Sequence, residues 1–181
     1  MADLSQIARI MIWHHQDNNH DSPGIFIGLP REIARQFPKH KEEDSSPQHI
    51  TVLILNKIPL IFEKKVLKIV QEVCEQTKPF LVRLGKPRKF VNPEGQIILH
   101  SPIRGKRLIR FHDALKSALM QNGISVDNKF PTYEPHTTIA YVDSKKELKQ
   151  YKDIKPIGEW FVDQIWIWGF SKEPKLIILG K

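Results

Sequence analysis

The sequence lacks the motifs by which many enzymes bind phosphate groups, dinucleotides or metal ions. Its 181 residues include a single cysteine, Cys74, so neither an internal disulfide nor a paired-cysteine motif is available. It contains no GxxxxGKS/T loop, no GxGxxG and no HExxH. Nucleoside-triphosphate hydrolysis, dinucleotide redox chemistry and zincin-type catalysis are therefore without support, and we expect no cofactor and no bound metal.

Long apolar runs are also missing. The apolar segment nearest the N-terminus, residues 7–13, is short, is interrupted by Arg9 and lacks a small-residue cleavage site. We therefore expect neither a signal peptide nor a membrane span. Cys74 lies in a helical pattern that predicts a buried free thiol, which fits a reducing compartment, and we predict a cytoplasmic protein.

Acidic residues are almost absent between Arg83 and Arg110, where eight basic residues accompany one acid, Glu94. Elsewhere the charges nearly cancel, so most of the net charge of +8 belongs to this segment. A polyanionic substrate would be attracted to it, although a solvated hairpin that keeps the protein soluble is the alternative. Arg83, Arg88 and Arg104 are the candidate phosphate contacts, because one guanidinium pairs with two phosphate oxygens at once.

Two tripeptides, His49-Ile50-Thr51 and His136-Thr137-Thr138, each begin an apolar stretch rich in β-branched residues. In a strand, side chains two residues apart lie over the same face at about 6 to 7 Å. Each strand would therefore present an imidazole and a hydroxyl together. The alternative is that both are ordinary strand histidines facing solvent. A third match, His20-Asp21-Ser22, lies in a polar stretch with no strand pattern after it, and we set it aside.

Two such pairs facing across a cleft suit the cleavage of a phosphodiester without a metal ion. One neutral histidine would remove a proton from water or from a 2′-hydroxyl, while the other, protonated, would donate to the departing oxygen. Thr51 and Thr138 would hydrogen-bond the non-bridging oxygens as negative charge builds on the phosphate. The sequence does not assign which of His49 and His136 is the base.

The stretches SPQHITVLIL and YEPHTTIAYV resemble the two motifs of the 2H phosphoesterase superfamily, whose name refers to two His-x-Thr/Ser motifs. The second is especially similar to that of the bacterial and phage 2′-5′ RNA ligase (cyclic phosphodiesterase) branch. The resemblance spans roughly residues 24–180. It implies a duplicated, two-lobed α+β fold with antiparallel or mixed sheets, flanked by helices, around a central groove.

The resemblance also implies phosphodiester chemistry on RNA ends or small oligonucleotides. We predict a metal-independent phosphodiesterase that hydrolyses 2′,3′-cyclic phosphates and is a candidate for reversible 2′-5′ ligation. One alternative is a phage-type nuclease that degrades cyclic oligonucleotide defence signals. Another is a nucleotide- or RNA-binding module without catalysis. RNA or a small cyclic oligonucleotide is the expected partner, with no membrane and no obligate protein partner.

Aromatic residues near the motifs are candidates to stack a nucleobase. Tyr133 lies three residues before His136, and a tryptophan of the late strand, Trp166 or Trp168, is the second candidate, with Trp168 preferred. Core packing of the segment around these tryptophans is the alternative.

The other histidines have simpler interpretations. His112 falls on the apolar side of its helix, as a helix-face or core residue does, and His100 ends the basic hairpin, where solvent exposure is expected and substrate contact is the alternative. A polar N-terminal loop explains four residues with ligand-type side chains better than a metal site does: His14, His15, Asp17 and His20.

Strand and helix patterns follow one another in the same order in both halves of the chain. We therefore predict a single domain over residues 1–181, made of two pseudo-symmetric lobes, with residues 1–23 as an N-terminal extension or loop. The first motif lies near 49–55 and the second near 136–142. Apolar periodicity predicts helices over 31–37, 63–77, 107–122 and 144–151. The remaining predicted strands are 25–29, 80–84, 96–99, 160–168 and 175–179, with 80–84 and 96–99 forming a hairpin about a turn at 92–95.

Overall fold

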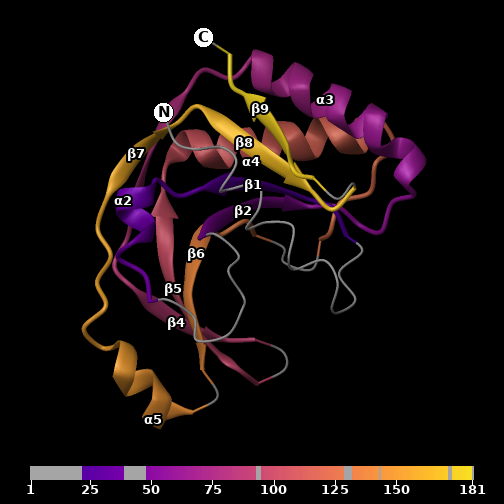
Figure 1. Ribbon diagram of the computed structural model, residues 1–181. Helices are drawn as coiled ribbons and strands as arrows, with labels where there is room; N and C mark the ends of the chain where they lie inside the picture. The colour runs from indigo at the N-terminus through magenta and orange to yellow at the C-terminus, as the bar shows by residue number, and fades with distance from the viewer. Residues whose placement is uncertain are drawn as a thin grey trace.

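The computed structural model describes residues 22–38, 48–92, 95–128, 132–142, 144–170 and 173–180. These residues form two antiparallel sheets and two long helices (Figure 1). The first sheet has the order β2-β1-β8-β9. Its strands are β1 (Gly24–Gly28), β2 (His49–Ile54), β8 (Gln164–Trp168) and β9 (Lys175–Ile178).

The second sheet has the order β4-β5-β3-β7, and β6 also pairs with β5. Its strands are β3 (Phe80–Leu84), β4 (Arg88–Val91), β5 (Ile97–Arg104), β6 (His136–Val142) and β7 (Glu159–Val162). Strands β2 and β6, which carry the two motifs, lie beside each other where the sheets meet. The α+β class with antiparallel sheets and helices is thus confirmed.

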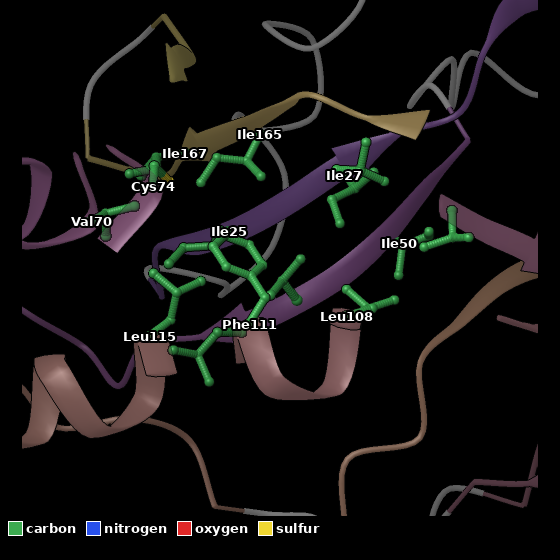
Figure 2. Packing of buried hydrophobic residues seen from close by; sticks show 14 of the residues in the cluster. Ile25, Ile27, Ile50, Val70, Cys74, Leu108, Phe111, Leu115, Ile165 and Ile167 are labelled. Atoms are coloured by element: carbon green, nitrogen blue, oxygen red, sulfur yellow. The ribbon is translucent and has the colours of Figure 1, made fainter. Parts of the chain in front are cut away.

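The long helices cover the inner face of the first sheet. Helix α3 (Glu63–Glu75) packs against α4 (Lys106–Gln121) and β9, and α4 also packs against β2 and β3. Alternate residues of β1, β2 and β8 point toward these helices and are almost fully buried, as Ile25, Ile50 and Ile165 illustrate (Figure 2). The shorter elements are α2 (Arg31–Ala34), α5 (Lys145–Leu148) and the 3-10 helices η2 (Leu60–Phe62) and η3 (Lys149–Tyr151).

The predicted hairpin is wrong in its pairing. Across the turn, β5 pairs with β4, a strand that the sequence pattern missed, and it meets β3 only through its last two residues. The sequence of β4 is Arg-Lys-Phe-Val, in which apolar and polar residues do not alternate, and all four residues are exposed. The strand therefore lacks the pattern by which a half-buried strand is predicted. The predicted strand 160–168 is also wrong, because Asp163 separates β7 from β8 and the two belong to different sheets.

Cys74 is a fully buried free thiol on α3, as predicted. Burial, with a smaller contribution from Glu75, raises the pKa of its thiol to about 12, so the reactive thiolate is scarce at neutral pH. We expect a thiol reagent such as DTNB to leave the native protein unmodified and to titrate one thiol per chain after unfolding in guanidinium. Rapid labelling of the native protein would contradict this assignment.

Some predictions concern residues that the structure does not describe. The N-terminal extension lies outside the described residues up to Asp21, and this includes the candidate ligands His14, His15, Asp17 and His20. The pseudo-symmetry of the two halves stays a prediction. Within the described ranges, no helix combines the length and the apolar character needed to cross a membrane.

Candidate active site

The first motif places His49 and Thr51 on one face of β2. Both side chains are half-buried, whereas Ile50 between them is fully buried in the core. The pairing with β1 places Phe26 opposite Thr51, and the His49 ring lies edge-on to Phe26 with 5.1 Å between ring centroids. Strand geometry thus presents an imidazole and a hydroxyl on the face turned away from the core.

The second motif repeats this arrangement on β6. His136 and Thr138 are half-buried, and Thr137 between them is fully buried. In the pairing with β5, Pro102 lies opposite His136 and His100 lies opposite Thr138. The face of the sheet that carries the second motif therefore also carries a third histidine, on the neighbouring strand β5.

Two contacts join the motif strands, although they are far apart in the sequence. The Tyr133 hydroxyl donates to the Thr51 carbonyl oxygen at 3.0 Å, which ties the loop before β6 to β2. The Thr137 hydroxyl donates to the Gln48 side-chain oxygen at 3.4 Å, beside the start of the first motif. These contacts keep the two His-x-Thr segments on neighbouring strands.

The backbone determines which nitrogen His136 presents. Its Nδ1 lies 2.8 Å from the carbonyl oxygen of Glu134. A carbonyl oxygen can only accept, so Nδ1 carries a hydrogen in this contact. The other nitrogen, Nε2, is then the basic one in the neutral ring, ready to take a proton, and it is the second donor when the ring is charged.

His100 lies beside His136, with 5.1 Å between their ring centroids. His100 is only 9% exposed, so the prediction that it faces solvent is wrong. Phe90 of the missed strand β4 lies edge-on to both rings, at 5.2 Å from His100 and 5.9 Å from His136. Because no apolar alternation marks β4, the sequence carries no signal that this histidine would be covered.

Burial lowers the pKa of His100, and the nearby His136 and Arg88 lower it further, against a smaller opposing effect of Glu134. His100 is therefore neutral at pH 7. Its Nδ1 is buried and has no hydrogen-bond partner among the described residues. The ring thus places a neutral polar group next to the second motif.

We expect this neutral histidine to make the protein less stable in mild acid. Its folded-state pKa lies below the ordinary value of 6.5, so the unfolded chain binds the proton first as pH falls. The contribution of the neutral ring to the free energy of unfolding is fully present above pH 6.5. It is lost progressively as the pH falls from there to the folded-state pKa. Urea unfolding at about pH 7.5 and about pH 5 should show a smaller loss in His100→Gln than in the wild type. Equal losses would contradict the assignment.

A family model for the 2′-5′ RNA ligase superfamily matches residues 27–173, a range that includes both motif strands. The chain belongs to this superfamily of 2H phosphoesterases. The family resemblance expected from the two motifs is therefore confirmed. A comparison with curated protein sequences found no match.

Solved structures share the fold of this 2H phosphoesterase at low identity. TT0787 of Thermus thermophilus is 17% identical with a TM-score of 0.62, over 87% of this chain and 94% of that one. E. coli LigT complexed with NADP+ is 17% identical with a TM-score of 0.60, over 88% and 97%. Kluyveromyces marxianus Usb1 is 11% identical with a TM-score of 0.57, over 88% and 98%.

In this 2H phosphoesterase, His49 also borders an aromatic cluster of Phe26, Trp166 and Trp168. Trp168 is half-buried, and its ring centroid lies 6.0 Å from that of His49. Trp166 shares this face because Ile167, between the two tryptophans, points into the core. Trp168 therefore lies next to a motif histidine, and its part in stacking a base stays a prediction.

Tyr133 is engaged by the protein's own residues on two sides. Its ring stacks on His112 with centroids 3.9 Å apart and planes within 7°. Its hydroxyl is bound to the Thr51 carbonyl oxygen, and burial raises its pKa. His112 is 8% exposed, which confirms a core position on α4. Tyr133 thus fastens the second-motif loop to the first-motif strand, and base stacking by it stays a prediction.

The three candidate arginines are exposed and lie on the second sheet. Arg83 is opposite Arg104 in the β3–β5 pairing, and its Nε donates to Glu159 at 2.8 Å, so Arg83 already has an anionic partner. Arg88 is opposite His100 in the β4–β5 pairing. The register thus places Arg88 beside the histidines, although phosphate binding by each arginine stays a prediction.

The described residues include no group of three or more histidine, cysteine, aspartate or glutamate side chains placed to hold one metal ion. The charged and polar groups around the motifs include imidazoles, threonine hydroxyls and the guanidinium of Arg88, together with the side chains of Glu134 and Gln48. The imidazoles, hydroxyls and guanidinium move protons and hydrogen-bond anionic oxygens. Such a set matches phosphate chemistry driven by acid–base catalysis.

Proposed function

We propose that this protein is a metal-independent phosphodiesterase that acts on RNA ends or small oligonucleotides through His49 and His136. The main observation behind this proposal is that the two His-x-Thr segments lie on neighbouring strands. In each segment the histidine and the threonine two residues later, Thr51 or Thr138, are on the face away from the core. Membership of the 2′-5′ RNA ligase superfamily supports the reaction class.

In the proposed hydrolysis of a 2′,3′-cyclic phosphate, one neutral histidine takes a proton from water. The water oxygen attacks phosphorus, and the bond from phosphorus to one ribose oxygen breaks. The second, protonated histidine gives its proton to that ribose oxygen. Thr51 and Thr138 donate hydrogen bonds to the non-bridging oxygens, whose negative charge increases in the transition state. With a 5′-hydroxyl in place of water, the same step would be a ligation: the 5′ oxygen attacks phosphorus, the bond from phosphorus to the ribose 3′ oxygen breaks and that oxygen takes the proton, which leaves a 2′-5′ linkage.

Neighbouring groups support a nucleotide substrate. Arg88 supplies a positive charge beside the histidines, and Trp168 offers an aromatic ring near His49. E. coli LigT, which shares the fold, has been crystallised with 3′-AMP, a nucleotide with a phosphate on its ribose 3′ oxygen. RNA or a small oligonucleotide is accordingly the proposed partner, and the reduced thiol Cys74 fits a proposed cytoplasmic location.

We expect activity to survive EDTA. The test incubates the protein, with and without EDTA, with four substrate types: RNA ending in a 2′,3′-cyclic phosphate, linear 2′-5′ and 3′-5′ oligonucleotides, and cyclic di- and trinucleotides. Product analysis by chromatography identifies the bond cleaved. Turnover lost in EDTA and restored by a divalent metal would refute the metal-independent mechanism. Binding across the panel without turnover would instead select a non-catalytic module.

A further inference from the structure

A cavity of about 880 Å³ lies outside the two motifs, between residues 84–89 and residues 145–157. Apolar side chains contribute to its walls, among them the buried Leu84 and the half-buried Leu99 and Leu148. Its volume falls in the range of about 300 to 1,000 Å³ that is typical of ligand sites. Figure 1 shows α5, which forms one wall, at the opposite end of the molecule from α3.

Positive charge dominates this cavity. One wall carries Lys145, Lys149, Lys152 and Lys155, and the other carries Lys86, Arg88 and Lys89. All seven side chains are exposed. Among the residues that the structure describes, no acidic side chain lines the cavity and none of the seven basic ones forms an ion pair. A concave surface of one charge sign concentrates its field and attracts counter-charge. The cavity is therefore suited to bind a polyanionic ligand.

The four lysines on the α5 wall form a row that is longer than a single phosphate group. Consecutive members are three or four residues apart, through α5 and η3 and beyond. Lys145 and Lys149 are about 6 Å apart along the helix at a rise of 1.5 Å per residue, and Lys152 and Lys155 continue the row beyond η3. Several successive phosphates of an extended strand fit this spacing better than a single anion does.

Arg88 belongs both to the cavity and to the surroundings of the histidines. It lines the cavity, and it also lies opposite His100, whose ring is adjacent to that of His136. Leu99, which lines the cavity, and His100 are consecutive residues of β5 and therefore point to opposite faces of the sheet. A strand whose reacting end lies at the histidines would reach the lysines by passing around the edge strand β4, where Arg88 lies.

We propose that this cavity binds the phosphates of a single-stranded RNA on the 5′ side of the reacting end. The proposal rests on the proposed function, because a 2′,3′-cyclic phosphate is at the 3′ end of its strand and the remaining nucleotides extend in the 5′ direction. Lysines contact phosphate without reading bases, so binding is independent of sequence and weakens with salt. The enzyme then prefers oligonucleotides to cyclic mononucleotides.

The test compares two triple variants with the same loss of charge. Lys145→Gln/Lys149→Gln/Lys152→Gln alters the cavity. Lys64→Gln/Lys78→Gln/Lys175→Gln is the control, with three exposed lysines elsewhere on the described surface. For RNA of about ten nucleotides with a cyclic phosphate end, we expect the cavity variant to raise KM about tenfold. The slope of log kcat/KM against log salt should become shallower by about 2, from about 0.7 per lost phosphate contact.

Activity on a 2′,3′-cyclic mononucleotide should remain as in the wild type, because this substrate does not reach the lysines. Equal effects of the two triple variants, or no effect of the cavity variant, would overturn the proposal. Lys86→Gln/Lys89→Gln on the opposite wall provides an independent second variant with the same expectation.

Binding of a fluorescent RNA with an unreactive 3′-hydroxyl end, measured by anisotropy, separates this proposal from the proposed function. Weakened binding in the cavity variant, with no turnover of any substrate by the wild type, would refute only the catalytic function. Wild-type binding in the cavity variant, with normal turnover, would refute only the cavity assignment.

Discussion

Replacing His136 with alanine is expected to lower kcat/KM for a 2′,3′-cyclic phosphate by about 10² to 10⁴, and His49→Ala should do the same. Each change removes one of the two groups that transfer protons in the proposed step. Both rings are half-buried on the outer face of their strands, so their loss should leave the core intact. Steady-state kinetics measures the first effect, and circular dichroism with thermal unfolding measures the second.

Two comparisons distinguish a catalytic role from general damage. Tyr141→Phe changes an exposed residue of the same strand, about 16 Å along β6 from His136, and should remain active. The double variant His49→Ala/His136→Ala should lose little more than either single variant, because two groups that act in one step are not additive. The wild-type rate should follow a bell-shaped pH profile, and each single variant should lose one of its limbs. Full activity in both single variants would refute the mechanism.

The sequence was sufficient to predict the motif strands because each motif begins an apolar stretch rich in β-branched residues. Ile50 and Thr137 are fully buried while their neighbours on either side are less so, as the strand period of two requires at the start of each strand. The helices α3 and α4 were predictable for a similar reason, since their buried residues recur at helical spacing. Just after α4, Gly123 has a φ of 76°, the left-handed conformation in which glycine commonly ends a helix.

The surroundings of the motifs were harder to predict because they depend on pairing rather than on local pattern. The burial of His100 results from β4, whose four exposed residues show no periodicity. A register shift between Leu99 and His100 then determines which residue of β5 lies opposite Thr138. Neither the coverage nor the shift leaves a mark in the local sequence.

The distribution of charge on the folded protein was also only partly predictable from the sequence. The basic segment between Arg83 and Arg110 was visible in the sequence, but the lysines from Lys145 to Lys155 lie outside it. Only the fold places the two groups on opposite walls of one cavity. Similarly, the ion pair of Arg83 with Glu159 follows from the β3–β7 pairing of residues far apart in the chain.

Replacing Thr138 with valine is expected to lower kcat by about 10² to 10³, an effect of the size seen when one donor to a developing oxyanion is removed. Valine keeps the branched shape that suits a strand and removes only the hydroxyl. In the proposed mechanism this hydroxyl donates to a non-bridging oxygen whose charge grows in the transition state. The loss should therefore appear in kcat more than in KM. Thr51→Val should behave alike.

Thr137→Val provides a matched control at the adjacent position of the same strand. Thr137 is fully buried on the opposite face, where its hydroxyl donates to Gln48. The same substitution there removes a structural hydrogen bond, so we expect a loss of stability of about 1 kcal/mol, with a much smaller effect on kcat. Chemical denaturation and steady-state kinetics on both variants separate the two roles. If Thr137→Val lowers kcat as much as Thr138→Val does, the hydroxyl of Thr138 has no special part in the chemistry, and the threonines of the motifs act only in holding the strands.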